Sequence, residues 1–468
     1  MKIVFYSSNS NIFDKENFFI TTLPSHFQKW KEFIKNHPED EIYFVTEQPG
    51  MFILDLPPQN QIDYKQLENE NIFIESSENI DSFVNKILTF EPDIAISMSF
   101  WVAPFDWLGI QDSLIAEKLN EHGIKSICHS AQLNYDFFDK YKTKQLLEKN
   151  NFNTPKGIYV NHDMYFCAGN RKEIKRNVYK DYILNQVRKL QFPLIAKDPF
   201  GLSSYGMQVL NSYGEVCNYL NSKKNNSDRI IEEMIDGEQF GIEFYCNSNF
   251  QNSEQNLSIF PPFIFSVNKY GITSPKQSIK IGPIFNKKYN IEELYKDIKK
   301  LTEIFKFNGI AQMDLVFNNG KWYIIEINPR LSGMSLTDAA LMNDFNNNLF
   351  EMIFFHFVLT KNLFYKNTNN NFINNNQNFE KCINIKFPIL TEEQLYKIKN
   401  FSFVKYVCQT ENKAALQERE KGFCEVIICA ETFEKLLENL LKIEKDFPNL
   451  IEKSFFENAK TIINNLQN

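Results

Sequence analysis

The sequence lacks several features that mark well-known classes of protein. Its formal net charge is −7, so there is no basic excess with which to hold a nucleic-acid backbone. No apolar run reaches the roughly 18 residues needed to span a bilayer, and the apolar part of MKIVFYSSNS is far shorter than a signal-peptide core. These absences predict a cytoplasmic protein with no membrane and no nucleic-acid partner.

The cysteines and glycines also lack the spacings that mark metal and dinucleotide sites. The eight cysteines are scattered, without a CxxC pair or a cysteine–histidine ligand pattern. Reduced thiols are therefore expected rather than zinc or disulfides. No GxGxxG follows the first apolar run, so a dinucleotide-binding interpretation is weak. No internal repeat is visible either.

The length and the alternation of patterns predict a protein of several lobes. With 468 residues the chain is too long for one compact core, which predicts two to four domains. Apolar runs alternate with helix-sized segments, of which 112–122 ends at Gly123, a residue suited to a helix C-terminus. This alternation predicts a parallel sheet built from βαβ units. The expected strands are 2–7, 41–46 and 93–100, and the expected helices are 25–36, 80–90 and 112–122.

Beyond residue 130 the patterns are mixed. Asn290, with Glu293 three positions on, has the capping-box pattern at the start of a helix over 290–306. The Asn-rich segment 367–379 is expected to be a linker or an exposed loop. Strands in 380–430 and a helix over 431–445 predict a small C-terminal α+β lobe. Other expected elements are helices over 136–150 and 180–190, a strand in FPLIAKDPF, and two strands around the turn Asp236–Gly237.

The stretch YIIEINPRLSG carries the clearest site signal. Alternation along a strand puts Glu326 and Asn328 on one face. A two-residue turn at Asn319–Gly320 would place Asp314 opposite Ile325, on the wrong face. A three-residue loop over 319–321 would place Asp314 opposite Glu326, and this loop is therefore the expectation.

Two carboxylates that face each other across a sheet repel, and a divalent cation would relieve the repulsion. Oxygen ligands suit Mg²⁺ or Mn²⁺, and Arg330 would offer a planar donor fork to a phosphate or a carboxylate. The alternative is a solvated sheet face on which a lysine or arginine pairs with the acids.

Other segments could bind phosphate and a nucleotide base, although each signal is weak alone. Lys197 ends a strand, and the following Gly/Ser-containing loop over 198–207 could present backbone N–H groups. Lys140 competes with Lys142 and Lys144 on a basic helix. The segment IIEEMIDGEQF could cradle a base through residues 233–235, while Glu238 accepts from a ribose hydroxyl; its alternative is a plain hairpin.

Taken in order, these segments resemble the ATP-grasp superfamily of carboxylate–amine and carboxylate–thiol ligases. The similar runs are FDKYKTKQLLEKNNFNTP, FPLIAKDPFGLSSYGM, IIEEMIDGEQFGIEF and AQMDLVFNNGKWYIIEINPRLSG, which span roughly 136–340. Asn151–Phe152 stands where the family usually has glycine.

The resemblance implies ATP and Mg²⁺ (or Mn²⁺) as cofactors, bound between two lobes, and an acyl-phosphate intermediate. It implies α/β and α+β architecture: a pre-ATP-grasp domain over 1–130, an ATP-grasp domain over 131–365 with a mobile lid lobe at about 155–235, a linker at 366–380, and a C-terminal lobe over 381–468. The implied site residues are as follows: Lys140 and Lys197 on phosphates; Ser203, Ser204 and Gly206 in the phosphate loop; Glu232, Glu233, Met234 and Ile235 at adenine; Glu238 at ribose; Asp314, Glu326 and Asn328 on the metal; and Arg330, with Lys197, in catalysis.

The resemblance favours an amide- or peptide-forming ligase that acts on small carboxylates and amines, with amino acids expected as the substrates, and a homodimer is an open option. Residues 268–283 and 330–335 are the candidate acceptor contacts. A biotin-carboxylase-like or phosphoribosyl-type ligase is the alternative, although no biotin-attachment motif is present. A nucleotide-binding protein without turnover is a further alternative.

Overall fold

The computed structural model of the chain defines most of its backbone. The described residues are 1–8, 18–47, 63–75, 79–100, 108–167, 176–200, 206–247, 257–269, 271–273, 277–341, 345, 347–359, 379–412 and 421–467. Within these ranges no helix is long and apolar enough to cross a membrane.

The N-terminal part contains the predicted parallel sheet. Its strand order is β4-β3-β1-β5-β6, and its neighbouring strands pair in parallel. One face packs against α3 and α4, and the other packs against α1 and the distant α12. Gly123 follows α4 with a φ of +82°, as its predicted place at a helix C-terminus requires. The elements are β1 (Lys2–Ser7), α1 (His26–Asn36), β3 (Glu41–Thr46), α2 (Tyr64–Asn69), β4 (Ile72–Ile74), α3 (Ile80–Leu88), β5 (Ile94–Ser97), α4 (Gly109–Glu121), β6 (Lys125–Ile127) and α12 (Leu349–Phe357).

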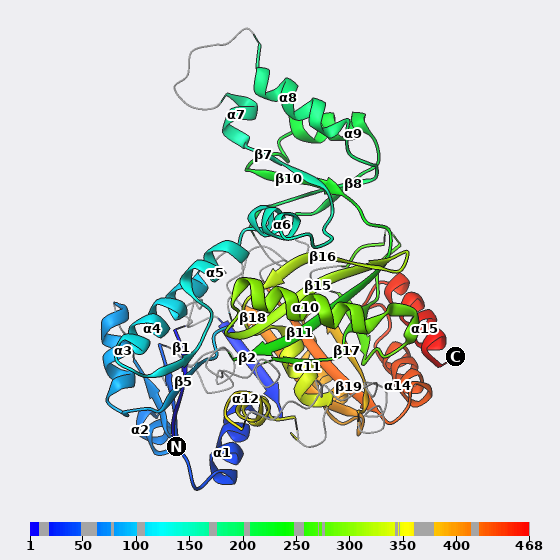
Figure 1. Cartoon of the computed structure of the whole chain (residues 1–468). Coiled ribbons are helices and arrows are strands. Elements are labelled where there is room, and N and C mark those ends of the chain that lie inside the picture. The colour runs from blue at the N-terminus through cyan, green and yellow to red at the C-terminus, as the bar shows by residue number, and fades with distance from the viewer. Residues whose placement is uncertain are drawn as a thin grey trace.

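A small antiparallel sheet with its own core stands apart from the body of the molecule (Figure 1). The strand order is β7-β10-β8-β9, and helices α7, α8 and α9 cover the face turned away from the body. Helices α5 (Ala131–Phe137) and α6 (Lys140–Lys149) precede it in the chain. Its elements are β7 (Gly157–Val160), α7 (His162–Phe166), α8 (Val178–Val187), β8 (Leu194–Lys197), β9 (Gln208–Leu210), α9 (Tyr213–Asn221) and β10 (Arg229–Glu233).

A ten-stranded sheet forms the body, with the order β16-β15-β11-β13-β14-β17-β19-β18-β2 and with β12 paired to β11. One face packs on α10, α14 and α15 in a single large core, which leaves the other face for the site. The strands are β2 (Phe18–Leu23), β11 (Glu238–Cys246), β12 (Leu257–Ile259), β13 (Phe263–Phe265), β14 (Ser278–Gly282), β15 (Gly309–Asn318), β16 (Lys321–Asn328), β17 (Lys381–Phe387), β18 (Val404–Asn412) and β19 (Gly422–Ala430). The helices are α10 (Ile291–Phe305), α11 (Gly333–Leu341), α13 (Glu392–Lys399), α14 (Phe433–Asp446) and α15 (Lys453–Gln467).

The mixture of a parallel α/β layer and large antiparallel sheets confirms the predicted fold class. Two pairings cross the predicted domain boundaries. Strand β2, from the first 130 residues, pairs with β18, and β17 pairs with β14, so the C-terminal strands extend the central sheet. The division into domains stays a prediction, and most of the expected linker at 366–380 lies outside the described residues.

The described structure has all eight cysteines as free thiols. Cys382 and Cys429 lie directly opposite each other on β17 and β19, with their sulfur atoms 2.8 Å apart in the interior.

The capping-box prediction at Asn290 is wrong. Asn290 has a φ of 45°, in the left-handed region, and its side chain caps no backbone N–H of α10. Its amide instead donates to the Glu293 carboxylate. The residue follows a short 3₁₀ turn at Lys287–Tyr289, and this turn imposes the left-handed conformation at which the pattern cannot form.

The predicted three-residue loop after β15 is also wrong, although the pairing that it was meant to explain is present. Asn318 pairs with Lys321 across a two-residue turn, in which Asn319 and Gly320 both have positive φ. Such turns suit the twist of a hairpin and favour Asn-Gly. A β-bulge then shifts the register by one residue, so Asp314 faces Glu326.

The bulge exists because each end of β16 has its own register requirement. Near the turn, Trp322 lies in the core against Phe240 and donates its indole N–H to the Tyr289 carbonyl at 2.8 Å. Beyond the bulge, Ile327 is buried in the same core. Ile327 lies five positions after Trp322, an odd offset, so strict alternation cannot bury both, and one extra residue resolves the conflict.

We predict that Gly320→Ala lowers the free energy of unfolding by about 1 kcal/mol, because a φ of +76° is costly for a residue with a Cβ atom. No atom lies within 4 Å of that added Cβ, so the loss of stability reports the backbone conformation and not a steric clash. Urea denaturation of this variant and of the exposed control Lys321→Ala measures it. Equal stability of the two variants would contradict the turn geometry.

Candidate functional site

A cavity of about 340 Å³ lies between the small sheet and the body. Strands β8 and β10 line it from the small sheet, and β11, β15 and β16 line it from the body. The first turn of α11 and four further strands, β13, β14, β17 and β19, also contribute to the wall. Segments more than 200 residues apart in the sequence therefore meet around one space.

Asp314 and Glu326 face each other on β15 and β16 and both line this cavity. Burial and the negative charge of Glu326 raise the pKa of Asp314 to about 6. The two carboxylates therefore retain repulsion that their surroundings do not fully offset.

A chain of side-chain hydrogen bonds runs along this face. Arg330 donates to Asn328 Oδ1 at 3.2 Å, and Asn328 donates to Gln312 Oε1 at 2.8 Å. Gln312 in turn donates to Asp314 Oδ1 at 2.7 Å. Asp314, Asn328 and Arg330 are thus linked in one row through Gln312, a residue that the sequence analysis did not single out.

Lys140, the first residue of α6, reaches the same acids. Its ammonium lies 3.2 Å from Glu326 Oε1, so the cationic partner expected under the alternative of a solvated face is present. Both side chains are largely buried and line the cavity, at 10% and 18% exposure, which does not fit the rest of that alternative. The competing Lys142 pairs with Asp136 at 2.6 Å instead.

Lys197 and Glu232 belong to a buried three-residue cluster. Glu232 Oε1 lies 2.5 Å from Lys197 Nζ, and its Oε2 lies 3.0 Å from Lys144 Nζ. Burial alone would raise the pKa of Glu232, but the two ammonium groups lower it below its usual value. Burial lowers the pKa of Lys144. Lys144, set aside in the sequence analysis as a competitor of Lys140, is thus a partner of the predicted residues.

The segment after β10 is not a plain hairpin. Strand β10 pairs with β7 and β8 in the small sheet, whereas β11 pairs with β13 and β15 in the body. Residues 234–237 therefore connect the two sheets. Glu233, Met234 and Ile235 line the cavity there, and the Met234 N–H donates to the Pro193 carbonyl at 2.9 Å.

The remaining predicted site residues are not among the described residues that line the cavity. The Glu238 carboxylate accepts from Lys288 and Tyr289 and is not among the described residues that line the cavity. Ser203 and Ser204 lie outside the described residues. Gly206 has a φ of +71°, and a Cβ there would lie 3.3 Å from the Asp198 carboxylate. The roles assigned to these residues stay predictions.

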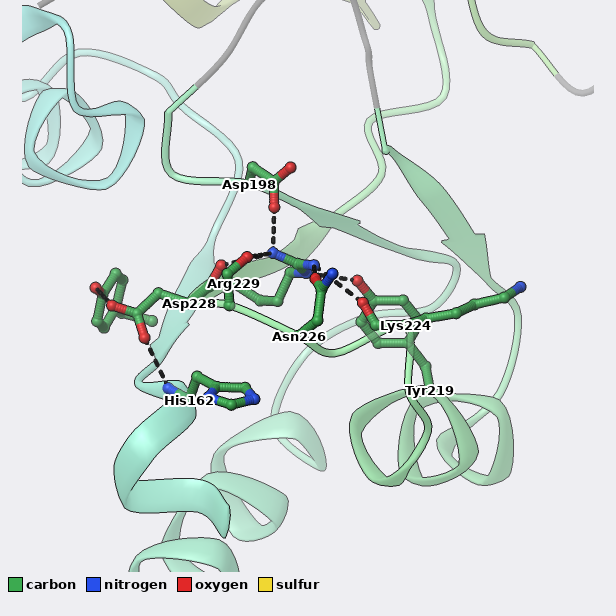
Figure 2. Close-up of polar contacts among 9 residues, drawn as sticks. His162, Asp198, Tyr219, Lys224, Asn226, Asp228 and Arg229 are labelled. Atoms are coloured by element: carbon green, nitrogen blue, oxygen red, sulfur yellow. Dashed lines mark hydrogen bonds and ion pairs between the residues drawn. The ribbon is translucent and has the colours of Figure 1, made fainter. Parts of the chain in front are cut away.

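Arg229 anchors the start of the predicted phosphate loop (Figure 2). Its guanidinium pairs with Asp198, the residue after Lys197. It also donates to the Tyr219 hydroxyl at 2.8 Å and to the Lys224 carbonyl at 2.9 Å. Figure 2 shows it at the centre of these contacts, between α9 and the turn before β10. Arg229 thereby ties Asp198 to the core of the small sheet.

The sequence analysis did not single out several other charged residues of the cavity wall. Lys280 lies on β14, inside the predicted acceptor segment, whereas Lys386 and Glu425 lie on β17 and β19. The last two come from the C-terminal strands, more than 50 residues beyond the last recognised motif. No local pattern marks them, because only the sheet register brings them to the cavity.

A buried acid pair lies beneath the loop that follows Arg330. Glu243 accepts hydrogen bonds from Ser332 at 2.6 Å and Ser335 at 2.8 Å, and burial raises its pKa to about 7. Asp338 on α11 is 0% exposed, and its oxygens accept from no described donor. Burial and the charge of Glu243 raise the pKa of Asp338 well above its usual value. Both carboxyl groups of the pair therefore keep their protons to higher pH than free carboxyl groups do.

The family comparison agrees with this geometry. Residues 137–334 match the family model described as the ATP-grasp domain, the region that contains both lysines, the connection between the sheets and the carboxylate pair. The predicted resemblance is confirmed over this region: residues 137–334 are similar to the ATP-grasp domain.

Curated relatives match about half of this chain or less. The carbamoyl phosphate synthase large chain of Thermoanaerobacter sp. (strain X514) is 22% identical over 47% of this chain, and the match covers only 18% of that protein. The chain therefore spans less than a fifth of the length of this relative. The D-alanine–D-alanine ligase of Pelagibacter ubique (strain HTCC1062) is 24% identical over 54% of this chain and 80% of that protein.

Solved structures are similar over nearly the whole chain. The ADP complex of an N5-carboxyaminoimidazole ribonucleotide synthetase superposes with a TM-score of 0.60 at 12% identity, covering 95% of this chain and 96% of that one. The L-amino acid ligase of Bacillus licheniformis superposes with a TM-score of 0.57 at 13% identity, covering 95% and 97%. At such identities these similarities establish the fold alone.

We predict that Arg229→Met destabilises the small sheet by about 2–3 kcal/mol, because Asp198, the buried Tyr219 hydroxyl and the partly buried Lys224 carbonyl lose their donor. Hydrogen exchange should become faster in β8 and β10, while β15 and β16 keep their protection. Arg188→Met, an exposed arginine of the same lobe, is the matched control. Unchanged exchange in β8 and β10 would contradict the anchoring role.

We predict that stability falls as pH rises from about 5 to 8, and that Asp338→Asn weakens this fall. In the folded state Glu243 and Asp338 keep protons to higher pH than in the unfolded chain, so the unfolded state binds fewer protons and folding loses stability with rising pH. Each unit of pKa shift corresponds to about 1.4 kcal/mol.

Melting temperatures of both proteins across this pH range provide the measurement. The melting temperature of Asp338→Asn relative to that of the wild type should increase as pH rises. The exposed control Asp163→Asn should show the same pH dependence as the wild type. A constant difference between Asp338→Asn and the wild type at every pH would contradict the raised pKa values of this pair.

Proposed function

We propose that the protein is an ATP-dependent carboxylate–amine ligase that forms an amide or peptide bond and releases ADP and phosphate. The observation that carries the proposal is the row formed by Asp314, Glu326, Asn328 and Arg330 at one side of the cavity, with Lys140 and Lys197 reaching the same space. Acids, a guanidinium and ammonium groups together are what the triphosphate of ATP and a carboxylate require.

The acid row suits a divalent metal. Two carboxylates and an amide oxygen are hard ligands typical of Mg²⁺ or Mn²⁺ sites. The raised pKa of Asp314 supports this fit, since a cation would remove the repulsion from Glu326. Asp314, Glu326 and Asn328 would hold the ion, which when bound neutralises phosphate charge and polarises the phosphoryl group.

In the proposed reaction a substrate carboxylate attacks the γ-phosphorus of ATP, and the bond to the β-phosphate oxygen breaks. An acyl phosphate and ADP result. An amine then attacks the acyl carbon, loses a proton and displaces phosphate. Lys140 and Lys197 would neutralise the phosphate oxygens, and Arg330 would hold the carboxylate and then the acyl phosphate through its planar donor fork.

The connection over 234–237 supports a place for the adenine. Met234 and Ile235 of this connection line the cavity, together with the apolar side chains of Ile195 and Leu315. The proposed nucleotide would lie with its base at this connection and its phosphates toward the acid row. Glu232 would orient Lys197 and Lys144 rather than contact the base, given its two ion pairs.

ADP release tests the proposal. We expect ATP- and Mg²⁺-dependent ADP release that requires a carboxylate and an amine together, across a panel of L-amino acids assayed singly and in pairs. ADP release with bicarbonate and no amine would favour the biotin-carboxylase-like or phosphoribosyl-type alternative. Binding of ATP without stimulated ADP release by any substrate would favour a protein without turnover.

We predict that Glu326→Gln lowers the Mg²⁺-dependent turnover by at least about 100-fold while leaving the fold intact. The variant loses one charged ligand and the partner of Lys140, but an amide preserves the side-chain volume. Circular dichroism verifies the fold, and Glu303→Gln, an exposed residue of α10 on the other side of the sheet, serves as the control. Undiminished turnover would overturn the metal assignment.

A further inference from the structure

The C-terminal strands place a charged row on the cavity wall. Ser278 on β14 lies directly opposite Lys386 on β17, and Lys386 lies directly opposite Glu425 on β19. Residues in register on adjacent strands share a face, and all three line the cavity. The wall beyond Arg330 therefore carries a cation and an anion supplied by segments outside the matched ATP-grasp region.

Glu425 is fixed in a set orientation. Its Oε1 accepts from the Asn384 amide at 2.8 Å, and the same amide nitrogen lies 2.8 Å from the Thr337 hydroxyl of α11. A Cβ on Gly333 would lie 3.2 Å from Oε1 and 3.5 Å from Oε2, so a larger residue at the start of α11 would require the carboxylate to shift by a few tenths of an ångström. The carboxylate thus lies against the same turn that follows Arg330.

The charges of this region are unevenly distributed. Lys280, Lys386 and Arg330 supply positive charge to the wall. Among the described residues, Glu425 is the one acid that β14, β17 and β19 contribute to the lining. A ligand that places a carboxylate toward the cations and an ammonium toward Glu425 would match both signs.

We infer that Glu425 binds the protonated amino group of the substrate, so that the carboxylate substrate of this enzyme is an amino acid. The inference rests on the proposed ligase function and narrows it. Arg330 and Lys280 face the substrate carboxylate, and an ammonium on a carboxylate forms a charge-assisted hydrogen bond that a substrate without the amino group cannot make. Glu425 is a specificity-determining residue and takes no part in the bond changes.

A comparison of each amino acid with its des-amino analogue tests this inference. The ligand pairs are L-alanine and propionate, L-glutamate and glutarate, and L-phenylalanine and 3-phenylpropionate. We expect the wild type to favour the amino acid by at least about tenfold in kcat/KM for ADP release. In Glu425→Gln the KM for the amino acid should rise about tenfold and the preference should vanish, while the KM for ATP stays unchanged.

Two further variants separate recognition from stability. Glu434→Gln makes the same charge change at an exposed site of the C-terminal lobe and should behave as the wild type. Gly333→Ala should weaken amino-acid binding without changing the net charge, because the added methyl group crowds the Glu425 carboxylate. An unchanged preference in both Glu425→Gln and Gly333→Ala would overturn the inference.

Ligand-observed NMR with the same pairs, in the absence of turnover, keeps the two proposals distinguishable. Failure of the wild type to release ADP with any substrate would count against the ligase function. Binding of the amino acid but not of its des-amino analogue, lost in Glu425→Gln, would support the subsite independently. Equal binding of both ligands by the wild type would overturn the subsite.

Discussion

The repulsion between the carboxylates of Asp314 and Glu326 is the constraint around which the site is arranged. The two acids face each other on adjacent strands, and burial raises the pKa of Asp314 to about 6. Lys140 reaches across from α6 to offset part of this charge, and the row from Arg330 to Gln312 fixes the remaining donors and acceptors. Cations offset the negative charge of these carboxylates, and the surrounding lysines and the proposed metal supply them.

The two faces of the body sheet differ: one packs against helices in the core, and the other carries the charged residues of the site. The face packed on α10, α14 and α15 is almost wholly apolar. The opposite face carries the acid row, Glu243 and the C-terminal lysine and glutamate. The bulge in β16 is the point at which this separation is enforced, because it lets Trp322 and Ile327 both enter the core while Glu326 faces the cavity.

The small sheet and the C-terminal strands give the cavity two different ends. Residues 234–237 join the small sheet to the body, and Arg229 ties the end of β8 to the core of the small sheet. At the other end, β17 and β19 extend the body sheet past Arg330. The nucleotide is proposed at the first end and the amino acid at the second, so the reacting groups would meet beside the acid row.

The sequence by itself determined the parallel N-terminal layer, most strands, several helices and the shared face of Glu326 and Asn328, because these follow from local periodicity and short motifs. It did not determine the turn and bulge of β16, since a register is set by the burial of Trp322 and Ile327 against distant residues. Nor did it mark Lys144 as a partner of Glu232, or Lys386 and Glu425 as cavity residues. Only tertiary structure decided these, because pairing between strands far apart in the chain leaves no local pattern.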